Sequence, residues 1–91
     1  MGEWVNMTGE DLGECAKLYV QVFNSAPWND HWTVETSYKR LLDIHDSPGF
    51  VGLKFMMAGR IKGAVLGNCE QWYRGMQFNL KEMYVSNELA L

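Results

Sequence analysis

The feature that most constrains the fold of this chain is a change in the spacing of its apolar residues at Pro48-Gly49. Before this dipeptide, apolar residues recur every three or four positions, as they do on one face of an α-helix. After it, they alternate with other residues in the two-residue period of a β-strand. The change predicts helices in the first half of the chain and antiparallel strands in the second.

Two helices are expected in the first half. The first begins at Thr8-Gly9-Glu10-Asp11, a variant of the capping box with Asp in the fourth position. Its apolar face runs to about Asn24 and consists of Leu12, Cys15, Ala16, Tyr19, Val22 and Phe23. Thr33 can cap the second helix, which ends at Asp46-Ser47-Pro48-Gly49.

Four strands are expected, one of them short and ahead of the helices. Their ranges are 3–7, 50–57, 61–72 and 78–85. Gly63 and Gly67 indicate a bulge or a close backbone approach within the third of these. Simple alternation along the last one places Phe78, Leu80, Glu82 and Tyr84 on the same side.

The order of elements predicts an α+β fold, β-α-α-β-β-β, with an antiparallel sheet and one domain over residues 1–91. Both sides of the late strands carry apolar residues, so a complete fold should cover both sides of the sheet. Two helices that are adjacent in sequence would cover only one.

Composition excludes several classes of function. The formal charge is −3, with Lys and Arg scattered, whereas a nucleic-acid-binding protein needs a basic stripe. No apolar run approaches the ~20 residues that span a bilayer, and the start is not a signal sequence, so we expect a cytoplasmic protein without membrane contact. Cys15 and Cys69 lack CxxC spacing and are expected to be reduced thiols. His31 and His45 lack metal-ligand spacing, so no metal site is predicted.

Three stretches resemble a known family. They are Phe23–Thr33, which contains Pro27-Trp28 and Trp32-Thr33, then the hairpin from Val51 to Leu66, ending in Ile61-Lys62-Gly63-Ala64-Val65-Leu66-Gly67, and finally Leu80-Lys81-Glu82-Met83-Tyr84-Val85. In this order they resemble the amino-terminal half of the GNAT-family N-acetyltransferases. The resemblance covers essentially the whole chain but about half of a family domain. It implies acetyl-CoA as the acyl donor and a primary amine as the acceptor.

In that family the last of these strands leads into a loop, Arg/Gln-x-x-Gly-x-Gly/Ala, whose backbone N–H groups hold the pyrophosphate of the coenzyme. This sequence ends before such a loop, and before the tyrosine that often serves as general acid. We therefore expect a truncated domain that binds acetyl-CoA poorly and is inactive alone.

The resemblance assigns the reaction to the strand at 78–85. The backbone of Met83, Tyr84 and Val85 would bind the pantetheine arm of acetyl-CoA and stabilise the oxyanion. Glu82 would accept the proton of the amine. A structural role for Glu82, as a rim carboxylate or as a partner of Lys81 or Lys62, is the alternative.

The acceptor site is expected at the bridge between the helices. Trp28, Asp30 and Trp32 would supply an aromatic wall and a carboxylate, which suit a cationic amine. Alternatively, one Trp fills the core and Asp30 caps a turn. Glu70 and Trp72, at the end of the strand 61–72, are further candidates. The acceptor remains open among polyamines, aminoglycosides, amino acids and protein amino termini.

Two other functions compete with acetyl transfer. One is a non-catalytic module that binds a partner or associates with itself. The strand 78–85 would present an unpaired edge and an apolar face, from which we predict a homodimer. The other is a small α+β domain that binds an aromatic or cationic ligand.

Overall fold

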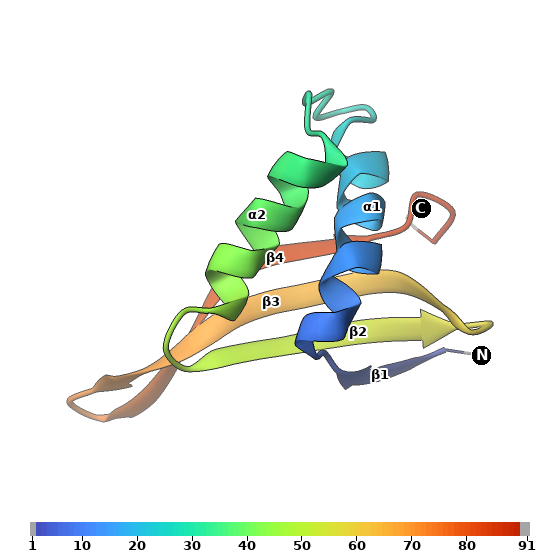
Figure 1. Ribbon diagram of the computed structural model, residues 1–91. Coiled ribbons are helices and arrows are strands. Elements are labelled where there is room, and N and C mark those ends of the chain that lie inside the picture. Colours follow the sequence, from blue (N-terminus) through green and yellow to red (C-terminus); the bar gives the residue numbers. More distant parts are fainter. Residues whose placement is uncertain (1, 90–91) are drawn as a thin grey trace.

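The computed structural model describes residues 2–89 and confirms the predicted α+β fold. A four-stranded antiparallel sheet has the order β1-β2-β3-β4, and two helices follow the first strand (Figure 1). The elements are β1 Glu3–Asn6, the 3₁₀ turn η1 Gly9–Asp11, α1 Leu12–Phe23, α2 Val34–His45, β2 Phe50–Met57, β3 Arg60–Trp72 and β4 Gly75–Val85.

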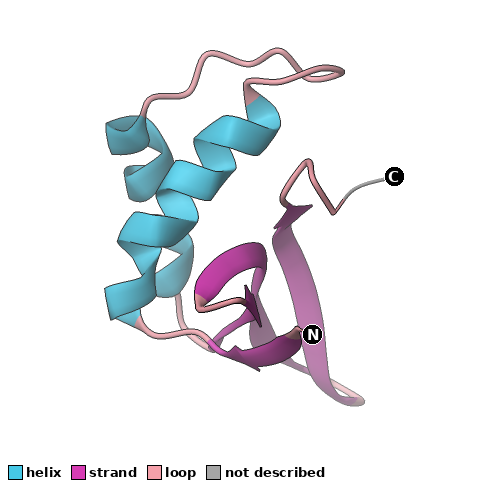
Figure 2. Cartoon of the chain, turned by 90° about the vertical axis from the view of Figure 1, so that its right-hand side faces the viewer, coloured by secondary structure: helices cyan, strands magenta, loops and turns pink. Residues whose placement is uncertain are grey.

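Both helices pack on the same face of the sheet (Figures 1 and 2). The core lies between the two layers and is formed from Leu12, Cys15, Ala16, Tyr19, Val22, Leu41, Ile44, Ile61, Ala64, Leu66 and Tyr84, among others. Among the residues described, no element covers the opposite face, which is called the open face below. No helix in this part of the chain is long and apolar enough to cross a membrane.

The expected helix starts are present. Thr33 Oγ1 accepts a hydrogen bond from the N–H of Thr36 at 3.0 Å, which caps α2. The N–H of Thr8 donates to Asp11 Oδ2 at 2.8 Å, so Asp11 takes the part of the capping-box acid. Where the helices meet, the hydroxyl of the buried Ser37 donates to the carbonyl of Ala16 at 3.2 Å.

A β-bulge at Lys81 corrects the predicted facing of the last strand. Leu66 lies opposite Glu82, but the next residue of β3, Gly67, lies opposite Leu80. Residues opposite each other in an antiparallel pair share a face, so Lys81 is the extra residue. Glu82 and Tyr84 therefore face the helices, whereas Leu80 and Phe78 lie on the open face with Met83 and Val85. Simple alternation failed because it has no place for an inserted residue.

The β3–β4 hairpin extends beyond the ends of the helices as a two-stranded arm, at the lower left of Figure 1. Trp72 lies opposite Gly75 at its tip, and the side chains of Trp72, Tyr73 and Met76 are exposed. β4 begins at Gly75, three residues earlier than predicted, because its pairing with β3 continues to the turn.

Candidate functional site

The bridge between α1 and α2 is held by one asparagine. Asn24 donates from Nδ2 to the carbonyl of Trp32 at 2.8 Å and accepts from the N–H of Trp32 at 2.9 Å. The N–H of Asp30 donates to the carbonyl of Phe23 at 2.9 Å. Three hydrogen bonds thus tie the loop, at Asp30 and Trp32, to the end of α1.

The two tryptophans of the bridge have different environments. Trp32 packs edge-on against Tyr19, with ring centroids 5.0 Å apart, and its Nε1 donates to Asp30 Oδ2 at 3.2 Å. Trp28 packs edge-on against Phe23 at 5.2 Å and remains 52% exposed. Trp32 therefore lies against the core with Asp30 as its partner, and Trp28 is the ring that faces outward.

An apolar cavity of about 280 Å³ lies between this bridge and the end of β4. It is lined by Val22, Phe23, Trp28, Met83, Tyr84, Val85 and Asn87. The structure thus brings Trp28 of the predicted acceptor site together with all three strand residues of the predicted coenzyme site.

The backbone N–H and C=O groups of Met83, Tyr84 and Val85 do not all point the same way. The N–H of Ser86 donates to the carbonyl of Lys62 on β3 at 2.7 Å. In an antiparallel ladder, successive residues point their N–H and C=O groups alternately toward and away from the neighbouring strand. Tyr84 therefore pairs with β3, whereas the backbone groups of Met83 and Val85 point to the free edge of the sheet.

The side chain of Tyr84 has a structural part. It is buried, and its hydroxyl donates to the carbonyl of Cys15 at 2.9 Å. Burial raises the pKa of this phenol far above its ordinary value, so the hydroxyl is a permanent donor. Tyr84 joins β4 to α1 and fixes the strand beneath the bridge.

Glu82 lies on the helix side of β4 and is held by two donors from the helices. Its Oε2 accepts from the Tyr19 hydroxyl at 2.8 Å and from Arg40 Nε at 3.0 Å. Its side chain is 14% exposed. These partners come from α1 and α2, in place of the predicted Lys81 or Lys62; Lys62 pairs with Glu88 instead.

Both donors of Glu82 remain protonated. Burial, and next the hydrogen bond to Glu82, raise the pKa of Tyr19 well above its ordinary value. Although burial opposes it, the hydrogen bond to Glu82 raises the pKa of Arg40. Because both bonds go to Oε2, no donor among residues 2–89 reaches Oε1, which keeps access to solvent. The carboxylate is thus fixed by one oxygen and open at the other.

The remaining predicted site residues lie elsewhere. Glu70 and Trp72 are exposed on the hairpin arm and are not brought together with Trp28 and β4. Tyr19 and Arg40, by contrast, did not stand out as functional residues in the sequence. A tyrosine within a buried apolar stripe was the one signal, since its hydroxyl needs a partner. Nothing in the sequence paired Arg40 with a residue 42 positions later.

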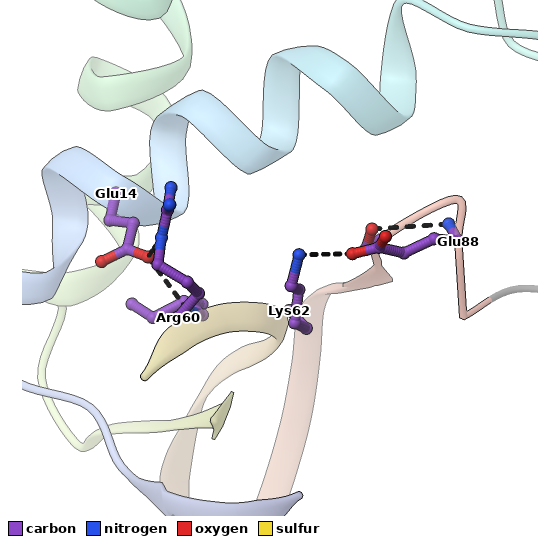
Figure 3. A network of polar contacts seen from close by, with 6 residues as sticks. Glu14, Arg60, Lys62 and Glu88 are labelled. Carbon is purple, nitrogen blue, oxygen red and sulfur yellow. Dashed lines mark hydrogen bonds and ion pairs between the residues drawn. The ribbon is translucent and has the colours of Figure 1, made fainter. Parts of the chain in front are cut away.

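A second cavity, of about 400 Å³, lies on the other side of α1 and is polar. Glu14, Arg60, Lys62 and Glu88 surround it (Figure 3). Glu14 Oε2 accepts from the backbone N–H of Ile61 at 2.9 Å and lies 3.5 Å from Arg60 Nε. Lys17 also lines the cavity, so its charged lining consists of three basic and two acidic side chains, and the two acids pair with Arg60 and Lys62. Across residues 2–89, no group of three His, Cys, Asp or Glu side chains is arranged to hold a metal ion.

No protein-family model matches the sequence, and no curated protein matches it. Solved structures do resemble it. A possible acetyltransferase from Clostridium difficile 630 superposes with a TM-score of 0.75 at 13% identity, over 99% of this chain and 60% of that one. A GNAT family acetyltransferase from Staphylococcus aureus gives 0.73 at 12% identity, over 98% and 65%.

The chain has the fold of the GNAT acetyltransferases. The aminoglycoside N-acetyltransferase AAC(6')-Iy in complex with CoA also shares this GNAT fold, with a TM-score of 0.70 at 14% identity over 99% of this chain. The chain spans about 60% of the length of these proteins. This coverage agrees with the resemblance to the amino-terminal half of the family, and identities this low concern the fold alone.

Proposed function

We propose that this chain provides the acyl-binding and acceptor half of an acetyl-CoA-dependent N-acetyltransferase that acts on a primary amine. One observation carries the proposal. An apolar cavity joins the exposed Trp28 to a strand edge whose backbone groups at Met83 and Val85 face outward. Glu82, with one oxygen open, lies on the same strand.

The cavity suits the acyl end of the coenzyme. Its lining is predominantly apolar, as required for the pantetheine arm and the acetyl group. An outward N–H at Met83 or Val85 would donate to the carbonyl oxygen of the thioester and stabilise the negative charge that develops there. Acetyl-CoA supplies an activated carbonyl carbon with a thiolate as its leaving group.

Glu82 would serve the amine. Its open Oε1 would accept a proton from the ammonium group, directly or through a water molecule, as the nitrogen becomes the nucleophile. Tyr19 and Arg40 would hold the other oxygen, so the carboxylate would not turn away. Glu82 would thus take up the first proton, from the ammonium group. As the C–N bond forms and the C–S bond breaks, the second proton would leave the nitrogen and pass, directly or through water, to the departing thiolate, which becomes the free thiol of CoA.

We further propose that residues 1–91 bind the coenzyme weakly and are inactive alone. Tight binding requires backbone N–H groups around the pyrophosphate, at the start of a helix. Within residues 2–89, the glycines are dispersed over strands, turns, η1, α1 and the position before β1, so no cluster of glycines precedes a helix. The GNAT-fold proteins above are also longer than this chain.

Aminoglycosides are the first acceptors to test. One GNAT-fold neighbour is an aminoglycoside acetyltransferase in complex with sisomicin, with a TM-score of 0.70 at 12% identity. Polyamines are the matched alternative because they present primary amines on a flexible chain without sugar rings.

Calorimetric titration with acetyl-CoA tests the proposed acyl site. W28A should weaken binding at least about tenfold, since burying a large apolar side chain contributes about 1.5–3 kcal/mol. W72A is the control, because Trp72 is equally exposed but lies on the hairpin arm. Equal affinities of the two variants, or no binding by the wild-type chain at millimolar acetyl-CoA, would contradict the proposed site.

A further inference from the structure

Another cavity, of about 260 Å³, lies where the end of α2 faces the start of the hairpin arm. It is lined by Arg40, Asp43, Ile44 and Ser47 of α2, by Asn68 of β3 and by Lys81 of β4. Its walls therefore come from α2 and from the helix side of the sheet, away from the open face. It shares no lining residue with the cavity beside Trp28.

The two ends of this cavity differ in charge. At one end, Arg40 lies against β4, since its Nε donates to Glu82 Oε2 at 3.0 Å, and Lys81 is the residue next to Glu82. At the other end, α2 terminates near Asn68, because the turn after the helix enters β2 opposite this residue. The basic end thus lies beside Glu82, and the other end lies at the C-terminus of α2.

The end at the C-terminus of α2 favours positive charge. Asp43 contributes a carboxylate, and the carbonyl groups at the end of a helix carry partial negative charge. The Oδ1 atom of Asn68 is buried and has no hydrogen-bond partner. Most buried polar atoms in proteins do have one. Because Asn68 lines the cavity, a small rotation of its amide would offer this oxygen to a donor there.

The charged groups of this cavity do not neutralise one another. Among residues 2–89, Arg40 forms its ion pair with Glu82, and neither Asp43 nor Lys81 forms an ion pair. The hydrogen bond from Arg40 to Glu82 uses Nε, and the two terminal nitrogens carry the remaining N–H donors of the guanidinium. The polar cavity beside Glu14 differs in this respect, because both of its acids pair with its bases.

We infer that this cavity binds a small zwitterion such as an α-amino acid. The carboxylate lies toward Arg40 and Lys81, and the ammonium group lies toward Asp43 and Asn68. Arginine suits the first role, because its planar group presents paired N–H donors to a carboxylate. The cavity volume is just below the range of about 300–1,000 Å³ for drug-sized ligands, which suits a molecule as small as an amino acid.

This ligand is distinct from the acceptor proposed above. In the inferred orientation its ammonium group lies at the end of the cavity away from Glu82. Its carboxylate shares the guanidinium of Arg40 with Glu82. Binding in this cavity therefore does not depend on acetyl transfer and can be measured on the chain without acetyl-CoA.

An NMR titration of the isotopically labelled chain tests the site with three probes. L-alanine carries both charges, whereas propionate and ethylamine each lack one of them. L-alanine should shift the amide signals of Ile44, Ser47 and Asn68 and saturate in the millimolar range. The other two probes should bind at least about tenfold more weakly, because each loses the hydrogen bonds of one charged group. Equal affinities for the three probes, or no saturable shift with L-alanine, would overturn the inference, as would shifts confined to the cavity beside Trp28.

Two substitutions test the two ends of the cavity separately. K81M and D43N should each weaken the binding of L-alanine at least about tenfold. K81M should leave the affinity for ethylamine unchanged, and D43N should leave that for propionate unchanged.

Lys39→Met and Glu35→Gln are the matched controls, since both residues are exposed on α2 outside the cavity. They should bind L-alanine as the wild-type chain does. Lys81 and Asp43 are exposed as well, so the amide spectrum of each variant should keep the dispersion of the folded chain. K81M and D43N variants that bind L-alanine as tightly as the controls would contradict the inferred site.

Discussion

The ring of Phe78 occupies the space that a side chain at Gly67 would need. A Cβ atom at Gly67 would lie 2.6 Å from Cζ of Phe78 and would also press on the backbone of Asn79. Gly67→Ala should therefore lower the free energy of unfolding by about 1–3 kcal/mol, the usual cost of overpacking. Urea denaturation measures the effect.

Gly13→Ala is the matched control for that substitution. Gly13 lies in α1, where a methyl group would point into open space. Alanine at this position should raise the free energy of unfolding by about 0.5–1 kcal/mol, because glycine is the poorer helix former. Similar changes in the two variants would contradict the close approach of the Asn79 backbone and the Phe78 ring to Gly67.

Tyr19→Phe should destabilise the protein without emptying the core. It removes the hydroxyl that donates to Glu82 and leaves the ring against Trp32 and Tyr84. Losing a hydrogen bond to a part-buried carboxylate should cost about 1–3 kcal/mol. Tyr38→Phe, at a 38% exposed position of α2, should change stability by less than about 0.5 kcal/mol. Thermal unfolding of both variants provides the comparison.

The ion pair between Asp11 and Lys54 should make the free energy of unfolding depend on pH in the acid range. Although burial opposes it, hydrogen bonds from Lys54 and Thr8 lower the pKa of Asp11 below its ordinary value of 3.8. A carboxyl whose pKa is lower in the folded state stabilises it above the unfolded pKa, and this contribution disappears as the pH falls through the folded pKa.

Asp11→Asn should therefore cost stability at pH 7, and the difference from the wild-type chain should shrink between about pH 4 and pH 2. Urea titrations at several pH values measure it. Asp43→Asn, on the exposed side of α2, serves as the control. A difference between Asp11→Asn and the wild type that stays constant from pH 7 to pH 2 would exclude the proposed linkage.

The Cys15 thiol should be unreactive in the folded protein. It is fully buried on the core-facing side of α1, and burial raises its pKa to about 12. At pH 8 only about one thiol in 10,000 is then ionised, and the thiolate is the reactive form. In a C69S variant, a disulfide reagent should label Cys15 only as fast as the chain opens. In C15S, the half-buried Cys69 should react faster in the folded state.

The fold followed from local patterns because each element has its own signal. The predicted helices end within about one residue of the ends of α1 and α2, and α2 begins directly after its predicted cap. The expected first turn of the first helix is the 3₁₀ turn η1, so α1 itself begins at Leu12, and β2 has the predicted bounds. Gly67 indicated an irregularity, and the register does shift there. The sequence could not show that the extra residue is Lys81, on the partner strand. Both faces of the sheet were expected to be covered, so apolar side chains at Phe78 and Leu80 would suit either face.

The part of the candidate site that could be predicted from the sequence is the part formed by neighbouring residues of one strand. Met83, Tyr84 and Val85 adjoin in sequence and line one cavity with Trp28. The backbone direction that separates Met83 and Val85 from Tyr84 depends on pairing with β3, which no local pattern records. The same is true of Glu82: its donors come from positions 63 and 42 residues earlier, so the network forms only when both helices lie on the sheet.

Lys81 could be deleted without changing the pairing of the rest of β4, because the residues on either side of it already have their own partners on β3. Without this lysine, Glu82 would still lie opposite Leu66 and Leu80 opposite Gly67, and the ladder would become regular. Phe78, Leu80, Met83 and Val85 would stay on the open face, and Glu82 and Tyr84 would still face the helices. What would change is the outer border of the sheet, which would run unbroken from the hairpin tip to Val85. A chain shortened by this one residue would therefore acquire an unbroken edge that can serve as a template for strand addition.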